Sequence, residues 1–302
     1  MHSKDRKHHH TDIKSENLLL AVALNFLITI VEIGGGILSN SYALLSDAMH
    51  NFGDTIAIFL AYLSNKISKR SPTLTKTFGF KRIEIFAALI NGIALVVICI
   101  FLLYGAVIRL KNPSPINGMM MVIVAIVALL SNFIAMALLN RDKEKNLNIK
   151  AAYLHLLIDT LSSVAVVIGG ILIFRFKIYW IDPILTFIIS IYIVKEAWYI
   201  LKQSYLIFLQ ATPEDMDLTK VKFSIEVMEE VENVHHIHAW KLNDTQNHFE
   251  CHIDLKKDIR ISETEEVLFK IKKMLTDEYN IVHTTIQFEY NCCDDKSIVK
   301  KY

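Results

Sequence analysis

Apolar and polar residues follow one another along this chain in long blocks. Six apolar stretches each hold about 20 residues, the length with which a helix crosses a hydrocarbon core of about 30 Å. They lie near residues 17–38, 43–65, 84–108, 117–139, 151–174 and 179–201. From Gln210 onward, charged residues are frequent and no stretch is long enough to span a bilayer. The pattern predicts a membrane all-α, six-helix transmembrane bundle (17–209), preceded by a cytosolic His-containing tail (1–16) and followed by a cytosolic domain (210–302).

The pattern of the last ninety or so residues changes to the shorter periods of a small α+β domain. Thr212 and Pro213 are typical of a helix start, as the N-cap and the first helical residue. The expected elements are, in order, a helix over 212–231, strands over 235–242 and 248–256, a helix over 262–279 and a strand over 281–290. This αββαβ order predicts a three-stranded sheet with its helices on one face. Strict alternation would put His236 and His238 on one face and His235 on the other, with Ile237.

Basic residues are distributed unevenly between the predicted loops. The loop between the second and third apolar stretches holds six lysines and arginines and no acidic residue, and the loop between the fourth and fifth holds four. Such loops stay in the cytoplasm, so an even number of crossings leaves both termini cytoplasmic. The formal net charge of +1 gives no reason to expect a nucleic acid partner. The four cysteines lie in a span or on the cytosolic side, where we expect reduced thiols.

Two His-x-x-x-Asp pairs, His50 with Asp54 and His155 with Asp159, lie inside the second and fifth apolar stretches. Ionisable residues within a membrane span are costly and usually functional. A separation of four residues puts both members of a pair on one face of a helix. Two imidazoles and two carboxylates suit a divalent ion of borderline hardness in tetrahedral geometry, which favours zinc over calcium or magnesium.

The depths of the two pairs in the membrane agree. At 1.5 Å per residue, His50 and Asp54 lie about 13 and 20 Å below the outer surface, and His155 and Asp159 about 22 and 16 Å below it. One pair alone could equally form a hydrogen bond between helices, but two pairs at one depth favour a metal site. Four other polar residues lie in the spans: Glu32, Asp47, Asn51 and Asn91. They could support the metal site or form a proton path, or they could make structural hydrogen bonds between helices, and both interpretations stay open.

Histidines are also frequent in the C-terminal part, which indicates a second metal region. The candidates are His235, His236, His238, His248, His252 and His283, with Glu289 and Cys292-Cys293 close behind. Each of them could equally be an ordinary surface or turn residue. The N-terminal run His8-His9-His10 could chelate a metal or be a mobile polar tail.

Several motifs in this order resemble the cation diffusion facilitator family of zinc transporters. They are Ser41–Asp54 (SYALLSDAMHNFGD), Phe78–Gly92 (FGFKRIEIFAALING), the His155–Asp159 pair, Asp182-Pro183, Val234–Trp240 (VHHIHAW) and His283–Glu289 (HTTIQFE). The resemblance covers nearly the whole chain. It implies a homodimer of six-span protomers with a ferredoxin-like cytosolic domain, and export of Zn²⁺ in exchange for protons. We accordingly expect a multi-pass protein of a bacterial inner (plasma) membrane, in contact with the lipid bilayer.

The resemblance also implies roles for individual residues. His50, Asp54, His155 and Asp159 match the family's transport site. His235 and His252 match positions that bind regulatory zinc in some members, and His283 and Glu289 correspond less securely. The chain departs from the common pattern at His236, where many members have Asp.

Two other functions remain possible for the same residues. An intramembrane zinc hydrolase could use a His and Asp site, although no His-Glu-x-x-His motif is present. A membrane-bound metal sensor could signal through the cytosolic domain without transport. Alternating access, in which protons and metal compete for the imidazoles, is the mechanism that we expect for a metal/proton antiporter.

Overall fold

The computed structural model describes residues 15–140, 147–292 and 296–300. The tail with His8-His9-His10 and the Cys293 position therefore lie outside the described residues. The chain divides into two compact units. The first contains the described residues of 1–59 and 91–199, and the second contains those of 60–90 and 200–302. Each unit is considered by itself below.

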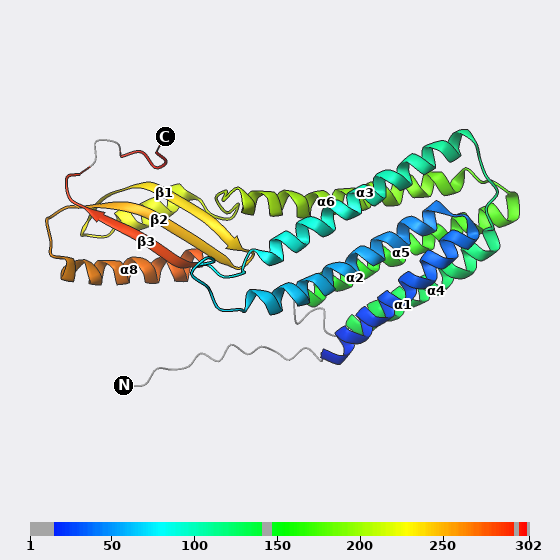
Figure 1. Ribbon diagram of the computed structural model, residues 1–302, viewed down its shortest axis with the longest axis horizontal. Helices are drawn as coiled ribbons and strands as arrows, with labels where there is room; N and C mark the ends of the chain where they lie inside the picture. The colour runs from blue at the N-terminus through cyan, green and yellow to red at the C-terminus, as the bar shows by residue number, and fades with distance from the viewer. Residues whose placement is uncertain (1–14, 141–146, 293–295, 301–302) are drawn as a thin grey trace. The chain divides into compact units, whose positions relative to one another are not determined.

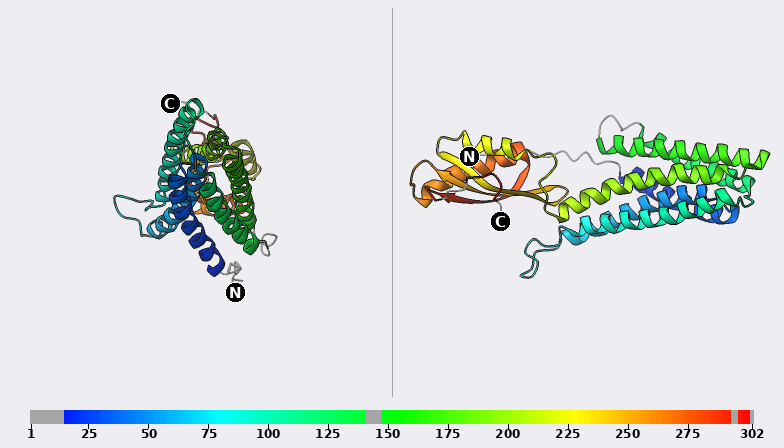
Figure 2. Two further views of the ribbon diagram at one scale, coloured as in Figure 1. Left: turned by 90° about the vertical axis from the view of Figure 1, so that its right-hand side faces the viewer. Right: turned by 90° about the horizontal axis from the view of Figure 1, so that it is seen from above.

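Six long helices account for the N-terminal two thirds of the chain, and within the first unit they run side by side (Figures 1 and 2). Their bounds are α1 (Ser15–Ser39), α2 (Tyr42–Ser68), α3 (Ile83–Lys111), α4 (Gly118–Leu139), α5 (Leu147–Phe176) and α6 (Ile181–Phe208). Each helix covers nearly all of one of the six apolar stretches, and its ends differ from those of the stretch by at most seven residues. The sequence therefore located these helices correctly.

Four of the helices are long and apolar enough to cross a membrane: α3, α4, residues Tyr153–Phe176 of α5, and α6. Large apolar side chains on them, such as Phe101 and Ile188, are exposed, as suits a surface in contact with lipid. In α1, a shorter apolar segment extends from Asn25 to Ser39. Along α2, Asp47, His50, Asn51 and Asp54 lower the mean hydropathy. The prediction of six spans stays a prediction for these two helices.

Glycines let α4 pack closely against α1 and α5. A Cβ atom on Gly35 of α1 would lie 2.5 Å from the Val124 side chain of α4. A Cβ atom on Gly118 of α4 would lie 2.5 Å from the backbone nitrogen of Phe174 in α5. Small residues at such positions bring helix backbones into direct contact, which is a common way to join helices inside a membrane.

The C-terminal part has the predicted αββαβ order. Its elements are α7 (Leu218–Glu226), β1 (Val231–Asn243), β2 (Gln246–Leu255), α8 (Ile261–Tyr279) and β3 (Ile281–Glu289). The strand order is β1-β2-β3, with β2 antiparallel to β1 and parallel to β3. Buried side chains of both helices and of alternate strand positions share one core, so α7 and α8 cover the same face of the sheet (Figure 1). The ferredoxin-like assignment stays a prediction.

Two local predictions for this part were wrong. The first helix begins at Leu218 rather than near Thr212, because residues 213–216 form a turn and the Asp217 side chain caps the helix. It also ends at Glu226, well before Val231, which is the first residue of β1. The Glu226 carboxylate accepts hydrogen bonds from the start of that strand, which favours the early end of the helix.

The second error concerns the faces of β1. The register between β1 and β2 shifts between His235 and His238, and His236 has a φ of 53°. This bulge inserts one residue, so alternation is lost there. The rings of His235, His236 and His238 consequently lie on one side of the sheet. The His252 ring of β2 lies between those of His235 and His236, with ring centroids 5.7 and 4.5 Å away, and the His236 and His238 centroids are 5.1 Å apart. We call this side of the sheet, opposite α7 and α8, the helix-free face.

Candidate metal centre

The two His-x-x-x-Asp pairs meet between α2 and α5. His50 Nε2 lies 3.2 Å from Asp159 Oδ1, and His155 Nε2 lies 2.9 Å from Asp54 Oδ2. Within each helix, the imidazole nitrogen is 3.7 Å from the carboxylate four residues later. One ligand atom from each side chain lies within 4.8 Å of the other three. Zinc ligands at about 2.0 Å in a tetrahedron are about 3.3 Å apart, which falls inside the range of these contacts.

The four-ligand group is buried on one side and open on the other. The side chains of His50 and Asp159 are 6% and 5% exposed, whereas those of Asp54 and His155 are 29% and 36% exposed. The rings of the two histidines meet edge to face, with centroids 5.4 Å apart. An ion that exchanges with the surroundings would therefore pass Asp54 and His155.

Neighbouring polar side chains hold the helices that carry the ligands. The Ser162 hydroxyl donates to Asp47 Oδ1 at 2.6 Å, which joins α5 to α2 close to both pairs. At the start of α2, the buried Asp182 carboxylate of α6 accepts the Ser41 hydroxyl at 2.5 Å and the Tyr42 N–H at 3.0 Å. These contacts fix the position of α2 relative to α5 and α6.

A second group of possible ligands lies on the helix-free face of the sheet. His235 and His252 are paired across β1 and β2, and Glu289 ends β3 beside them. His235 Nε2 lies 3.3 Å from Glu289 Oε2, and His252 Nδ1 lies 2.7 Å from Glu289 Oε1. Neither nitrogen makes a hydrogen bond within the part of the chain that the structure describes. Two imidazole nitrogens that face a carboxylate in this way suit a divalent metal ion.

Comparisons with known proteins decide the family. The family model described as "Cation efflux transmembrane domain" matches residues 18–209, and the one described as "Cation efflux protein, cytoplasmic domain" matches residues 213–291. The chain belongs to the cation efflux family. It is 37% identical to the zinc transporter ZitB of Escherichia coli (strain K12) over 97% of this chain and 93% of that protein. Identity is 35% to the metal cation efflux system protein CzcD of Cupriavidus metallidurans (98% and 93% covered) and to the cadmium, cobalt and zinc/H(+)-K(+) antiporter of Bacillus subtilis (93% and 91%).

Proteins of the cation efflux family are transporters, so this chain is a transporter and not an enzyme. The alternative of an intramembrane zinc hydrolase is therefore wrong. Membership also agrees with the resemblance that the sequence motifs indicated.

His283, which the sequence suggested as a possible ligand of the second group, lies apart from that group in this cation efflux protein. His283 is paired with His248, and the two ring centroids are 4.7 Å apart. Six residues along a strand correspond to about 20 Å, so His283 cannot reach Glu289 within the same sheet. Burial and the neighbouring His283 lower the pKa of His248. His283 therefore belongs to a histidine pair at the opposite end of β3.

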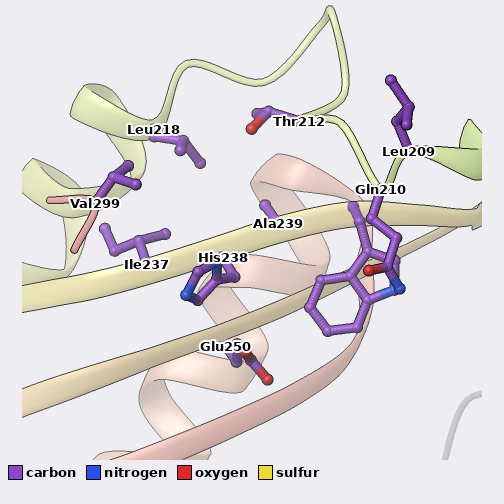
Figure 3. A pocket seen from close by; sticks show the side chains of 10 residues that line it. Leu209, Gln210, Thr212, Leu218, Ile237, His238, Ala239, Glu250 and Val299 are labelled. Atoms are coloured by element: carbon purple, nitrogen blue, oxygen red, sulfur yellow. The ribbon is translucent and has the colours of Figure 1, made fainter. Parts of the chain in front are cut away.

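A cavity of about 490 Å³ lies elsewhere in the second unit (Figure 3). Its polar lining includes His238 and Glu250, which are paired across β1 and β2, and Trp240. The remaining lining residues are Leu209, Gln210, Thr212, Leu218, Ile237, Ala239 and Val299. The cavity contains none of the ligands of either group, so the fold keeps it separate from both.

Some supporting residues could not be identified from the sequence alone. Ser162 was missed, although its position three residues after Asp159 puts it near the same helix face. The contact of Asp182 with the start of α2 was missed as well, because the two segments are 140 residues apart. Nothing in either local sequence indicates the partner.

Proposed function

We propose that this chain exports a divalent metal ion, Zn²⁺, in exchange for protons by alternating access. The four-ligand group of His50, Asp54, His155 and Asp159 is the transport site. Its mutual distances of at most 4.8 Å are the observation that carries the proposal, since four donors meet where two helices supply two each. Six spans would leave both termini in the cytoplasm, within a bacterial inner membrane.

Zinc is the ion that the donor set favours. Nitrogen and carboxylate oxygen in equal number suit zinc in tetrahedral geometry, whereas calcium and magnesium prefer oxygen alone. Two carboxylates also neutralise the charge of the divalent ion, which lowers the cost of holding it in an apolar environment. The names of the relatives, which mention zinc together with cadmium and cobalt, support the same class of ion.

Exchange for protons follows from the chemistry of imidazole. A neutral imidazole binds the metal, and a protonated one repels it. On the cytoplasmic side the site would take up zinc as His50 and His155 release protons, and protonation on the far side would release the ion. A relative whose name includes H(+) supports this direction of coupling.

The second group, His235, His252 and Glu289, would bind regulatory zinc. It lies in the part that matches the family's cytoplasmic domain, away from the transmembrane match. Zinc there would join three strands and, in the homodimer that we propose, favour the transporting conformation. Loss of this group should change the response to low zinc and leave the transport route intact.

Zinc flux into proteoliposomes that contain a zinc-sensitive dye tests the proposal. We expect Asp54→Asn to abolish flux, while Asp215→Asn, the same change at a side chain that is 75% exposed, keeps it. The double variant His235→Ala/His252→Ala should lose activation at low zinc but should still transport zinc at saturating concentrations. Wild-type flux in Asp54→Asn, with the protein correctly inserted, would refute the assignment of the transport site. A wild-type protein that binds zinc without any flux would instead support the sensor function.

A further inference from the structure

Glu32 is a fully buried carboxyl group that the proposed transport site does not use. It lies on α1, where its neighbours along the chain are apolar, and 0% of its surface is exposed. A carboxylate in such a place is unfavourable unless a partner compensates its charge. Its position inside the helical bundle therefore calls for a specific role.

The contacts of Glu32 leave two acceptor oxygens without a donor. Asn51 of α2 donates from Nδ2 to Glu32 Oε2 at 2.8 Å. Glu32 Oε1 and Asn51 Oδ1 are both buried and accept no hydrogen bond from the residues that the structure describes. Asn51 itself is only 1% exposed. Two buried acceptors that face no donor favour the binding of a positive charge.

The surrounding charges point in the same direction. Asp47 precedes Asn51 by one turn on the same face of α2, and its charge acts on Glu32. The other charged groups that act on Glu32 are Asp159 of α5 and His50 of α2. The neighbouring helix α4 has no titratable side chain. Two buried carboxylic side chains, Glu32 and Asp47, thus lie close enough for the charge of one to act on the other.

We propose that the two free oxygens of Glu32 and Asn51 form a second cation site that holds an exchanged ion in addition to the protons on His50 and His155. The ion carries one positive charge. It is either a proton on the Glu32 carboxyl group or an alkali ion between the two side chains. The inference rests on the proposed antiport.

The chemistry of the donors separates this site from the transport site. Oxygen donors alone select hard cations, whereas the two imidazoles of the transport site select zinc. The charges of His50 and Asp159 act on Glu32, so the two sites are neighbours. Two cations so close in a medium of low dielectric constant repel each other. Occupation of one site would therefore disfavour the other, which is the coupling that an exchange requires.

The test compares Glu32→Gln with wild type and with Glu214→Gln, the same change at an exposed position. Zinc affinity is measured on the full-length protein in detergent by competition with a chelator. Zinc flux is measured in proteoliposomes under an imposed proton gradient or an imposed potassium gradient. We expect Glu32→Gln to lose at least tenfold of the gradient-driven flux, and its zinc affinity to change less than that of a transport-site variant such as Asp159→Asn. Glu214→Gln should match wild type.

The gradient whose effect on zinc flux is lost in Glu32→Gln identifies the ion of the second site as a proton or an alkali ion. Asn51→Leu, which removes the second free acceptor, should also reduce the coupling if Glu32→Gln does not fold. A Glu32→Gln protein that responds to both gradients as wild type does would make the Glu32–Asn51 contact a purely structural hydrogen bond and overturn the inference. A loss of zinc affinity equal to that of a transport-site variant would overturn it as well. Failure of the antiport itself appears in the wild type, where flux would ignore both gradients.

Discussion

Replacement of Asp159 by asparagine isolates the charge of one ligand. The change keeps the size of the side chain, which is 5% exposed and lies 3.2 Å from His50 Nε2. With both carboxylates present, a bound divalent ion gives a neutral group; after the change, one positive charge remains in an apolar environment. A charge at the centre of a bilayer costs about 2.5–3.5 kcal/mol. At about 1.4 kcal/mol per factor of ten, the zinc affinity should fall by about 60- to 300-fold.

An independent estimate agrees with this range. Loss of a group that merely supports a metal ligand costs about 10- to 100-fold in affinity, and loss of a ligand should cost at least as much. The assay is chelator competition on full-length protein that also carries His235→Ala and His252→Ala, so that only the transport site binds. Asp215→Asn in the same background is the control. An affinity that falls by less than about threefold would refute the reasoning that Asp159 is a ligand.

Three further predictions concern packing and titration. Burial opposes the charge of Asp254, but the hydrogen bond from Lys296 prevails and lowers the pKa of Asp254. The stabilisation by this ion pair is therefore complete above about pH 4 and is lost as the pH falls further. Lys296→Met should lower the unfolding temperature at pH 7 and have little effect at pH 2.5. Gly118→Ala would press its new methyl group against the Phe174 backbone and should destabilise the protein by about 1–3 kcal/mol in thermal unfolding. Burial raises the pKa of Cys251 to about 12, so with the other cysteines changed to serine a thiol reagent at pH 8 should label Cys251 only after unfolding.

The helices could be predicted because their signal is local and long. An apolar stretch of twenty residues specifies a helix almost regardless of its neighbours, and the spacing of four residues puts His50 beside Asp54 in any helix. Depth in the membrane then brings the α2 and α5 pairs to one level, and the structure has their four side chains together. That these side chains bind the transported ion stays a proposal.

The bounds of α7 depend on local contacts of Asp217 and Glu226, whereas the other outcomes that the sequence did not reveal depend on contacts between distant segments. The bulge at His236 results from the register between two strands, which no alternation within β1 reveals. The distance between His283 and Glu289 follows from the pairing of β3 along β2, although both residues belong to one short motif. The contact between Glu32 and Asn51 depends on the rotation of α1 relative to α2, and a single sequence does not specify it.

The close packing of α4 with α5 gives the ligand group one rigid side. The backbones of these two helices meet at Gly118 and Phe174 and resist sliding, so α4 and α5 form a stiff pair that carries His155 and Asp159. The other two ligands belong to α2, which the hydrogen bond between the Ser162 and Asp47 side chains joins to α5. An ion bound by ligands of both helices would add to this contact and hold α2 against the stiff pair.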